Sequence, residues 1–483
     1  MLSFRIIPDF NTAPGKLHVR GNICVMIRTQ HESNKAPEGL FFFKKSMAQN
    51  IDLLVEARWV IPVEPRLVLD NHAVAVNGGR IVEILPSSAV HRYRAKRHLK
   101  LASHALMPGF VNLHTHAAMA LMRGMADDLP LMRWLSEHIW PAERRHLGRD
   151  FVKEGTLLAC AEMLKGGTTA FNDMYFFPGA AAEAAAEAGM RAAIGMVVLD
   201  FPTPYAGDAD DYIGKGLAAR DEHASNPLLS FFFAPHAPYT VSDASFGKIL
   251  TYASELDLPV HLHLCETGEE VESSLKAHRT GPVGRMARLG LLGPGLIAVH
   301  MVKATPEDVD VFAAHGCHVA HCPTSNLKLA SGFAPVAAMI DAGINVGIGT
   351  DGAASNNRSD MFSEMRMAAL LAKGTSGRAD ALPAYEALAM ATLNGAKALG
   401  MEKDIGSLEP GKYADMVAVE MAGCEISPIY DPVSHLVYCA GREHVDHVWV
   451  AGEARVEGGG LVSLDEAALT KKASFWKERI AGK

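Results

Sequence analysis

Two stretches of the chain place histidines two residues apart inside short apolar runs. The first contains His114 and His116, and the second contains His261 and His263, followed closely by Glu266. Because strand side chains alternate between faces, residues two apart point to one side and can grip one divalent ion. His263 stands nearer the end of its expected strand and is the favoured ligand. His261 is expected to make a hydrogen-bonded contact in the core.

Two further apolar runs end in a polar residue, namely His300 and Asp351. Four separate strand ends then carry imidazoles and a carboxylate that need partners once they are buried, and one metal ion satisfies them all. Three nitrogen ligands and one oxygen ligand suit Zn²⁺ or Fe²⁺, and such an ion lowers the pKa of bound water to about 7. Asp351 can take the proton of that water, His300 can hydrogen-bond the hydroxide, and Glu266 can carry a proton to the substrate.

The region of the fourth expected strand bears on the number of metal ions. Two-metal barrels of this general type use a lysine at the end of that strand as a bridging carbamate. Residues 228–239 read LLSFFFAPHAPY and contain no lysine. We therefore expect a single divalent metal ion.

Alternating strand-like and helix-like segments between residues 106 and 399 would position these side chains. Strands are expected at 109–114, 169–174, 192–199, 229–234, 260–264, 297–300, 318–321 and 345–348, with helices at 151–165, 179–188, 243–256, 306–315 and 361–372. Eight such units are the number that closes an α/β fold of the (β/α)8 barrel type, whose active sites lie at the C-terminal ends of the strands. A doubly wound open sheet would require a glycine-rich phosphate loop after the first strand, and none is present.

Two β-rich regions flank the expected barrel. Residues 51–105 include Gly78 and Gly79, which predict a hairpin, and residues 404–462 contain further apolar strands. Each region is too short to bury a core alone, so we expect one small β-sandwich built from both chain ends. The predicted organisation is an N-terminal section of the sandwich at 47–105, a metal-dependent barrel at 106–403, and a C-terminal section of the sandwich with a final helix at 404–483.

Residues 1–46 differ from the rest of the chain. They contain seven Lys or Arg and three Asp or Glu, a net charge of 7 − 3 = +4, and show no clear periodicity. They lack the apolar region and cleavage site of a secretory signal. We interpret them as an N-terminal extension that is disordered or not native, with Met47 as the alternative start.

The amino-acid composition argues against nucleic acid and membranes as binding partners. The 483 residues include 46 Lys and Arg against 54 Asp and Glu, a net charge of −8, so the chain lacks the positive field that holds nucleic acid. Seven scattered cysteines without a CxxC pair indicate the reducing cytoplasm. No apolar run reaches the roughly 18 residues of a membrane span. We expect a small-molecule substrate and, because many barrels associate through their helices, a homo-oligomer.

The motifs themselves resemble a known superfamily. PGFVNLHTH (108–116), HLHLCET (261–267), AVHMV (298–302) and GTDG (349–352), in this order, resemble the amidohydrolase superfamily. GSLEPGKYADMV (406–417) resembles the strand by which such chains return to their small domain. The resemblance covers about residues 51–462 and implies a metal-dependent barrel.

Three longer segments, 116–143, 319–336 and 349–366, resemble the 5-methylthioadenosine/S-adenosylhomocysteine deaminases. This resemblance implies hydrolytic deamination of an adenine nucleoside, such as 5′-methylthioadenosine, S-adenosylhomocysteine or adenosine. The implied metal ligands are His114, His116, His263 and Asp351, with Zn²⁺ expected before Fe²⁺. The implied substrate contacts are Glu143, His236, Glu266 and Asp351, and the implied catalytic residues are Glu266, His300 and Asp351.

The side chains of Glu143 and His236 are chemically suited to bind a nucleoside. One carboxylate at Glu143 can accept both hydroxyl groups of a ribose, and His236 can hydrogen-bond the nucleoside. Trp134, Trp140 and Met119 are candidates for the pocket wall. Some members of the family contact the substrate through arginines near the third strand, whereas residues 195–212 offer no matching arginine. The 5′ tail of the nucleoside is therefore expected to be recognised differently.

Two other interpretations remain open. The first is a deaminase or chlorohydrolase of another N-heterocycle, guanine-like or s-triazine, for which Glu143→Ala would barely change KM. The second is a non-catalytic metal-binding scaffold. Against it stands the complete set of Glu266, His300 and Asp351, which a scaffold role does not require. A fold alone cannot distinguish these classes, so the site has to do so.

Overall fold

Eight parallel strands form the centre of the computed structural model, which describes residues 48–482. The strands are β5 Phe110–Thr115, β6 Thr168–Tyr175, β7 Arg191–Val198, β8 Leu229–Pro235, β9 Val260–Leu264, β10 Leu296–His300, β11 His318–His321 and β12 Asn345–Ile348. Neighbours in the chain are neighbours in the sheet, from β5 to β12. The amide of Asp351 donates to the carbonyl oxygen of His114 at 2.9 Å, and β12 contacts β5, so the sheet closes into a barrel.

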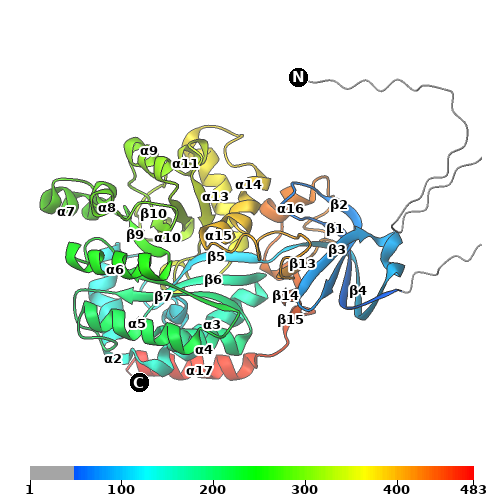
Figure 1. The fold of residues 1–483 in the computed structure, drawn as a ribbon, viewed down its shortest axis with the longest axis horizontal. Helices are drawn as coiled ribbons and strands as arrows, with labels where there is room; N and C mark the ends of the chain where they lie inside the picture. The colour runs from blue at the N-terminus through cyan, green and yellow to red at the C-terminus, as the bar shows by residue number, and fades with distance from the viewer. Residues whose placement is uncertain (1–47, 483) are drawn as a thin grey trace, which may run out of the picture. The chain divides into compact units, whose positions relative to one another are not determined.

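Helices follow the strands and cover the outside of the barrel (Figure 1). They include α3 Arg149–Lys165, α4 Pro178–Ala188, α5 Ala209–His223, α6 Asp243–Leu256, α9 Pro306–His315 and α13 Met361–Ser376. Asp208, Ser242 and Thr305 begin three of them, each accepting a hydrogen bond from the amide three residues further on. Because helices cover one face of the strands and the barrel interior the other, β6 and β7 are buried along their whole length.

The strands predicted for the barrel are confirmed to within one residue at either end, and all five predicted helices are present. The sequence did not predict the irregular connection after β5, which contains the 3-10 helix Ala117–Met122, α1 Leu131–Trp134, a π-helical turn Leu135–Ile139 and α2 Trp140–His146. It also did not predict α7 Gly268–His278 and α8 Pro282–Leu289 between β9 and β10. These connections help to form the site.

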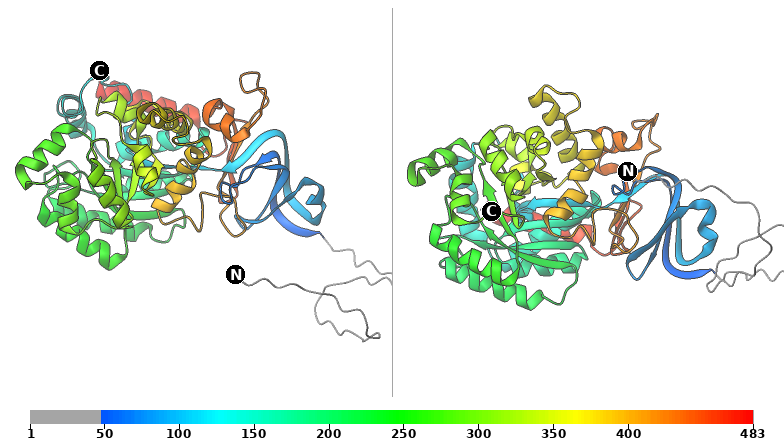
Figure 2. Two further views of the ribbon diagram at one scale, coloured as in Figure 1. Left: turned by 90° about the horizontal axis from the view of Figure 1, so that it is seen from above. Right: turned by 45° about the horizontal axis from the view of Figure 1, so that its top comes forward.

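A second sheet contains strands from both ends of the chain, which confirms the predicted small β domain. Its members are β1 Gln49–Val60, β2 Leu69–Asn77, β3 Arg80–Pro86, β4 Tyr93–Pro108, β13 Met416–Glu420, β14 Val445–Val450, β15 Glu453–Glu457 and β16 Gly460–Leu461. They form one continuous sheet in the order β16-β15-β14-β13-β4-β1-β2-β3. The antiparallel pairing of β4 with β13 joins the two chain ends, and the sheet lies beside the barrel (Figures 1 and 2).

The predicted hairpin at Gly78 and Gly79 connects β2 and β3. Both glycines have positive φ, 58° and 76°, as a two-residue primed turn requires. At Gly79 a Cβ atom would lie 2.6 Å from the carbonyl oxygen of Ala451, so the turn also needs glycine for close packing.

The last helix, α17 Glu466–Ile480, lies along the barrel (Figure 2). Nε1 of Trp476 donates to Oε2 of Glu154 at 2.7 Å, and the Trp476 ring meets the Phe151 ring edge-on at 5.2 Å. The domain limits at 105/106 and 403/404 stay predictions, and the expectation for residues 1–46 lies outside the described residues. Within residues 48–482, the longest apolar helices fall short of what a membrane crossing needs.

Candidate metal and substrate site

Three imidazoles and a carboxylate meet where β5, β9 and β12 end. Nε2 of His114 lies 3.2 Å from Nε2 of His263 and 3.3 Å from Oδ1 of Asp351, and Nε2 of His116 lies 3.3 Å from the same oxygen. A tetrahedral zinc ion with bonds of about 2.0–2.1 Å sets its ligand atoms roughly 3.3 Å apart. The four side chains therefore have the spacing of a tetrahedral metal site.

The outer nitrogens of two of these imidazoles are already engaged. Nδ1 of His116 lies 2.5 Å from the carbonyl oxygen of Met174, and Nδ1 of His263 lies 2.7 Å from that of His236. A carbonyl oxygen only accepts, so each Nδ1 carries the hydrogen and each Nε2 of the neutral ring presents a lone pair inward. Burial lowers the pKa of His114 to about 4 and that of His263 well below its usual value. Inward lone pairs beside a carboxylate fit a divalent metal ion.

Asp351 is held by two hydrogen bonds of its own. Its Oδ2 accepts from the hydroxyl of Ser325 at 2.6 Å, and its Oδ1 accepts from the amide of Gly352 at 2.7 Å. Burial alone would raise the pKa of Asp351, but the hydrogen bond with His114 and the neighbouring imidazoles hold that pKa well below its usual value. The carboxylate therefore stays ionised beside the three nitrogens.

His300 and Glu266 face each other next to the four candidate ligands. Nδ1 of His300 lies 2.8 Å from Oδ1 of Asn326 in α10 Pro323–Lys328, and Nε2 lies 3.8 Å from Oε1 of Glu266. Burial raises the pKa of Glu266, and the charge of His300 only partly opposes this. A carboxyl group that keeps its proton to higher pH is suited to protonate a substrate.

Glu143 and His236 approach the same space from other elements. Glu143 in α2 accepts a hydrogen bond from the hydroxyl of Tyr175 at 2.7 Å, and burial raises the pKa of Glu143 to about 7. His236 follows β8, with Nδ1 3.1 Å from Oγ1 of Thr240, and burial lowers the pKa of His236 to about 3. A neutral imidazole and a carboxyl group near its titration point therefore face the cavity.

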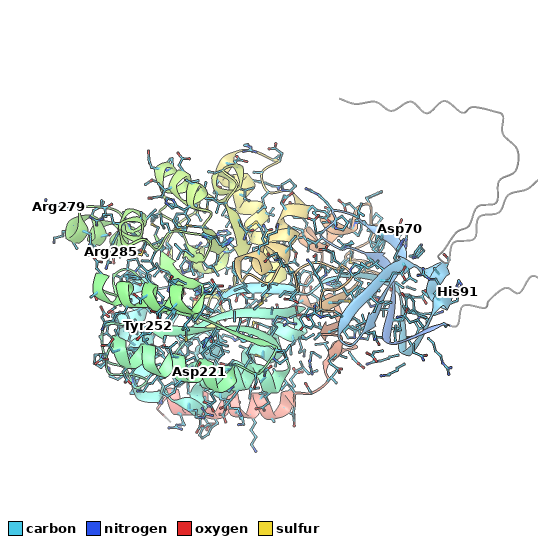
Figure 3. The ribbon with its side chains drawn as sticks, viewed as in Figure 1. Asp70, His91, Asp221, Tyr252, Arg279 and Arg285 are labelled. Atoms are coloured by element: carbon cyan, nitrogen blue, oxygen red, sulfur yellow. The ribbon has the colours of Figure 1, made fainter. Side chains whose placement is uncertain are left out.

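Arg285 in α8 fixes the loop that carries His236. Its guanidinium donates to the carbonyl oxygens of Pro238 and Val241 and, at 2.8 Å, to Oδ1 of Asp243. Figure 3 shows Arg285 at the end of the molecule opposite Asp70, far from the second sheet (β1–β4 and β13–β16), which we call the chain-end sheet. A helix inserted after β9 thus holds the loop after β8 in place.

One cavity of about 510 Å³ connects these groups. Met119, Trp134 and Trp140 line it, as predicted for the pocket wall. Much of the remaining wall is apolar and includes Leu131, Leu135, Val197, Leu199, Phe201 and Pro202. Among the described residues that line the cavity, Arg144 is the one lysine or arginine.

The structure brings all eight candidate site residues around this centre. The ring of His261 meets that of His114 edge-on at 5.0 Å, but His261 does not belong to the groups of side chains placed to hold an ion. Nδ1 of His261 lies 2.9 Å from Nδ2 of Asn172, a hydrogen-bonded core contact as predicted. Three supporting residues were not found from the sequence, namely Tyr175, Ser325 and Asn326. Tyr175 ends β6, so the strand-end rule that found the histidines could have found it.

Comparisons with known proteins agree with this geometry. The amidohydrolase family model matches residues 105–455. The 5-methylthioadenosine/S-adenosylhomocysteine deaminase of Teredinibacter turnerae is 48% identical over 435 residues, which are 90% of this chain and 98% of that protein. A crystal structure of a zinc-bound adenosine deaminase from Xanthomonas campestris matches with a TM-score of 0.89 at 48% identity, over 90% of this chain and 100% of that one.

A more distant structure shares the fold alone. The zinc complex of an atrazine chlorohydrolase from Arthrobacter aurescens matches with a TM-score of 0.82 at 23% identity, over 88% of this chain and 100% of that one. The family match spans well over half of the chain, and the similar relatives are matched over nearly their whole length. The chain therefore belongs to the amidohydrolase family, in which it groups with the 5-methylthioadenosine/S-adenosylhomocysteine deaminases.

Proposed function

We propose that this chain hydrolytically deaminates adenine nucleosides with a 5′-thioether, namely 5′-methylthioadenosine and S-adenosylhomocysteine. The observation that carries the proposal is one cavity lined by three of the four candidate metal ligands, His116, His263 and Asp351, and by the carboxyl groups of Glu266 and Glu143. We propose one zinc ion as the metal. The three-nitrogen, one-oxygen donor set and the zinc-bound Xanthomonas relative support that choice.

The reaction exchanges the amino group at C6 of the purine for oxygen, using water and releasing ammonia. The four candidate ligands would hold a divalent cation, which would lower the pKa of bound water to about 7 and so make that water a nucleophile. Asp351 takes one proton of the water, and Glu266 gives its proton to the ring nitrogen next to C6, which receives the electron pair. His300 hydrogen-bonds the incoming oxygen. Asp351 then passes its proton to the departing amine, and the hydroxyl proton returns to Glu266.

Glu143 is the proposed contact for the ribose. A carboxylate has two oxygens and can accept both ribose hydroxyls in charge-assisted hydrogen bonds. The hydroxyl of Tyr175 orients this carboxylate from the side. A guanine-like or triazine substrate has no hydroxyl pair to use it, so Glu143 favours a nucleoside over those alternatives.

The proposal is tested by incubating the purified chain with adenosine, 5′-methylthioadenosine and S-adenosylhomocysteine and following absorbance and ammonia. Glu266→Gln should keep the metal content and lower turnover by about 10²–10⁴-fold, because the ring nitrogen loses its proton donor. The matched control is Glu269→Gln, which changes an exposed carboxylate three residues away. Chelation should abolish activity and zinc should restore it. Failure on all three nucleosides by a metal-loaded protein would reject the substrate.

The apolar part of the cavity predicts which 5′ tail is preferred. Valine, leucine and phenylalanine side chains at 197, 199 and 201 offer no partner for the charged amino and carboxylate groups of homocysteine. A methylthio group gains apolar burial there, about 0.8 kcal/mol for each buried carbon. We therefore expect kcat/KM for 5′-methylthioadenosine to exceed that for S-adenosylhomocysteine by roughly tenfold or more.

Arg144 provides the control for this preference. It is exposed at the cavity wall and is the one cation there that can meet the homocysteine carboxylate. Arg144→Ala should lower kcat/KM for S-adenosylhomocysteine and leave 5′-methylthioadenosine unchanged, whereas Arg145→Ala should alter neither. Equal or better use of S-adenosylhomocysteine by the unmodified chain would contradict the preference.

We also propose that the protein works in a reducing compartment such as the cytoplasm. The six cysteines among the described residues are all free, four of them buried. Burial raises the pKa of Cys160, Cys265 and Cys322 well above the usual thiol value, which leaves them as unreactive thiols. The homo-oligomer stays a prediction.

A further inference from the structure

The backbone changes direction between the metal-site histidine of β9 and Glu266. His261 and His263 both point into the barrel, so an extended strand would turn residue 265 inward and residue 266 outward. The cavity is lined by Glu266 and not by Cys265. The change occurs at Cys265, whose φ is 52°. This left-handed conformation is unfavourable for a residue with a side chain, so something must hold it.

Glu270 holds the turn from the first turn of α7. Its Oε1 accepts from the amide of Cys265 at 2.9 Å, and its Oε2 accepts from the amide of Glu266 at 2.8 Å. The other side of the turn is fixed as well, because the amide of Lys303 donates to the carbonyl oxygen of Cys265 at 2.8 Å. Glu270 is 5% exposed, so water does not compete effectively for these two bonds.

This arrangement differs from the ordinary use of a glutamate at this helix position. Thr267 begins α7, and its hydroxyl accepts from the amide of Glu270, three residues on. In a capping box the glutamate carboxylate would in turn accept from the amide of the capping threonine. Here the carboxylate reaches past Thr267 to the two preceding amides. The rest of α7 extends outward to Arg279 at its far tip (Figure 3), so only its first turn serves the site.

We propose that Glu270 is a positioning residue for the deamination, whose carboxylate clamps the Cys265–Glu266 turn and so aims Glu266 at the base. The proposal rests on the proposed function only in that Glu266 is the proton donor. It predicts that Glu270 acts through Glu266 and not on the candidate metal ligands.

The test is a double-mutant cycle. Glu270→Gln replaces one acceptor by a donor and should lower kcat roughly 10- to 100-fold, with KM and the metal bound per chain little changed. In the Glu266→Gln background the same substitution should have no further effect, because the group it positions is already disabled. Glu269→Gln, one residue away and exposed, should match the unmodified chain in both backgrounds.

A second readout does not depend on activity. Hydrogen–deuterium exchange of the peptide spanning residues 264–267 should become faster in Glu270→Gln and stay unchanged in Glu269→Gln. If Glu270→Gln does not fold, Glu270→Asp serves instead, because the side chain keeps its carboxyl group but is one methylene too short to reach both amides. Unchanged exchange in Glu270→Gln, or an equal loss of activity in the unmodified and Glu266→Gln backgrounds, would overturn the clamp. Absence of any deaminase activity with faster exchange would reject the proposed function alone.

Discussion

The protonation of the buried carboxyl group of Glu143 affects both the proposed binding of the ribose and the stability of the fold. Burial raises its pKa to about 7, although the hydroxyl of Tyr175 donates to it and acts in the opposite direction. Below that pH the group is protonated and loses one of its two acceptor positions. Above that pH the carboxylate can accept both ribose hydroxyls.

Recognition of the ribose should therefore depend on pH. The ratio of kcat/KM for adenosine to that for 2′,3′-dideoxyadenosine should rise as the pH increases through about 7. Taking the ratio cancels the titration of groups that act on both substrates. Glu143→Gln should flatten the ratio and lower it by roughly 10- to 100-fold, since hydrogen bonds to a charged group contribute about 1.5–3 kcal/mol. A ratio that stays independent of pH in the unmodified chain would show that Glu143 does not bind the ribose.

The same pKa has a consequence for stability. A carboxyl group whose pKa is raised by folding binds its proton more tightly in the folded state, so its contribution becomes less favourable as the pH rises from the usual value to about 7. A shift from 4.5 to about 7 corresponds to roughly 3 kcal/mol at pH 8. Glu143→Gln should thus be more stable than the unmodified chain at pH 8, and the difference should shrink towards pH 5. Thermal unfolding at the two pH values measures this, with exposed Glu137→Gln as the control.

At the level of helices and strands, the barrel strands could be predicted from the sequence, whereas the backbone conformation at their ends could not. The strands could be predicted because buried parallel strands form short apolar runs between amphipathic helices. The backbone conformation where the chain leaves the strands could not be predicted, because Cys265, His300 and Asp351 have φ values of 52°, 75° and 62°. Such left-handed conformations cost about 1–3 kcal/mol each and persist only where surrounding contacts enforce them. The turn at Cys265 brings Glu266 to the cavity, where simple alternation would misplace it, and His300 and Asp351 line that cavity themselves.

The residues that hold the site residues in place, such as Ser325 and Asn326, could not be predicted from the sequence either. Asn326 and Ser325 lie on the short helix α10, and their partners His300 and Asp351 come from other strands. Nothing in the local sequence of α10 indicates those contacts, because they depend on how distant segments meet. Glu143 lies in an irregular connection, and its sequence context after Pro141 is that of an ordinary helix start. Its assignment came from family resemblance, and the structure adds its partner Tyr175 and its burial.

At the scale of the whole molecule, a buried ion pair joins the barrel to the chain-end sheet. Nε and Nη2 of Arg191, at the start of β7, donate to the two carboxylate oxygens of Asp415 at 3.0 and 3.2 Å. Asp415 directly precedes β13, and its Oδ1 also accepts from the amide of Ala451. Arg191 and Asp415 are 4% and 3% exposed. The pair lies at the opposite end of β7 from the cavity, at the face of a barrel that contributes stability rather than catalysis.

Removing one member of this pair should destabilise the chain without changing its chemistry. Arg191→Met leaves the Asp415 carboxylate buried without its partner, which typically costs about 3–5 kcal/mol. The matched control is the exposed pair of Arg92 and Glu83, of which Glu83 lies in β3, and Arg92→Met should cost at most about 1 kcal/mol. Adding Asp415→Asn to Arg191→Met should recover some of the loss, because no isolated charge then remains. Urea unfolding measures the stabilities, and kcat of the folded, metal-loaded variants should match that of the unmodified chain. A fall in kcat at unchanged stability would instead place this interface within the machinery that aligns the site.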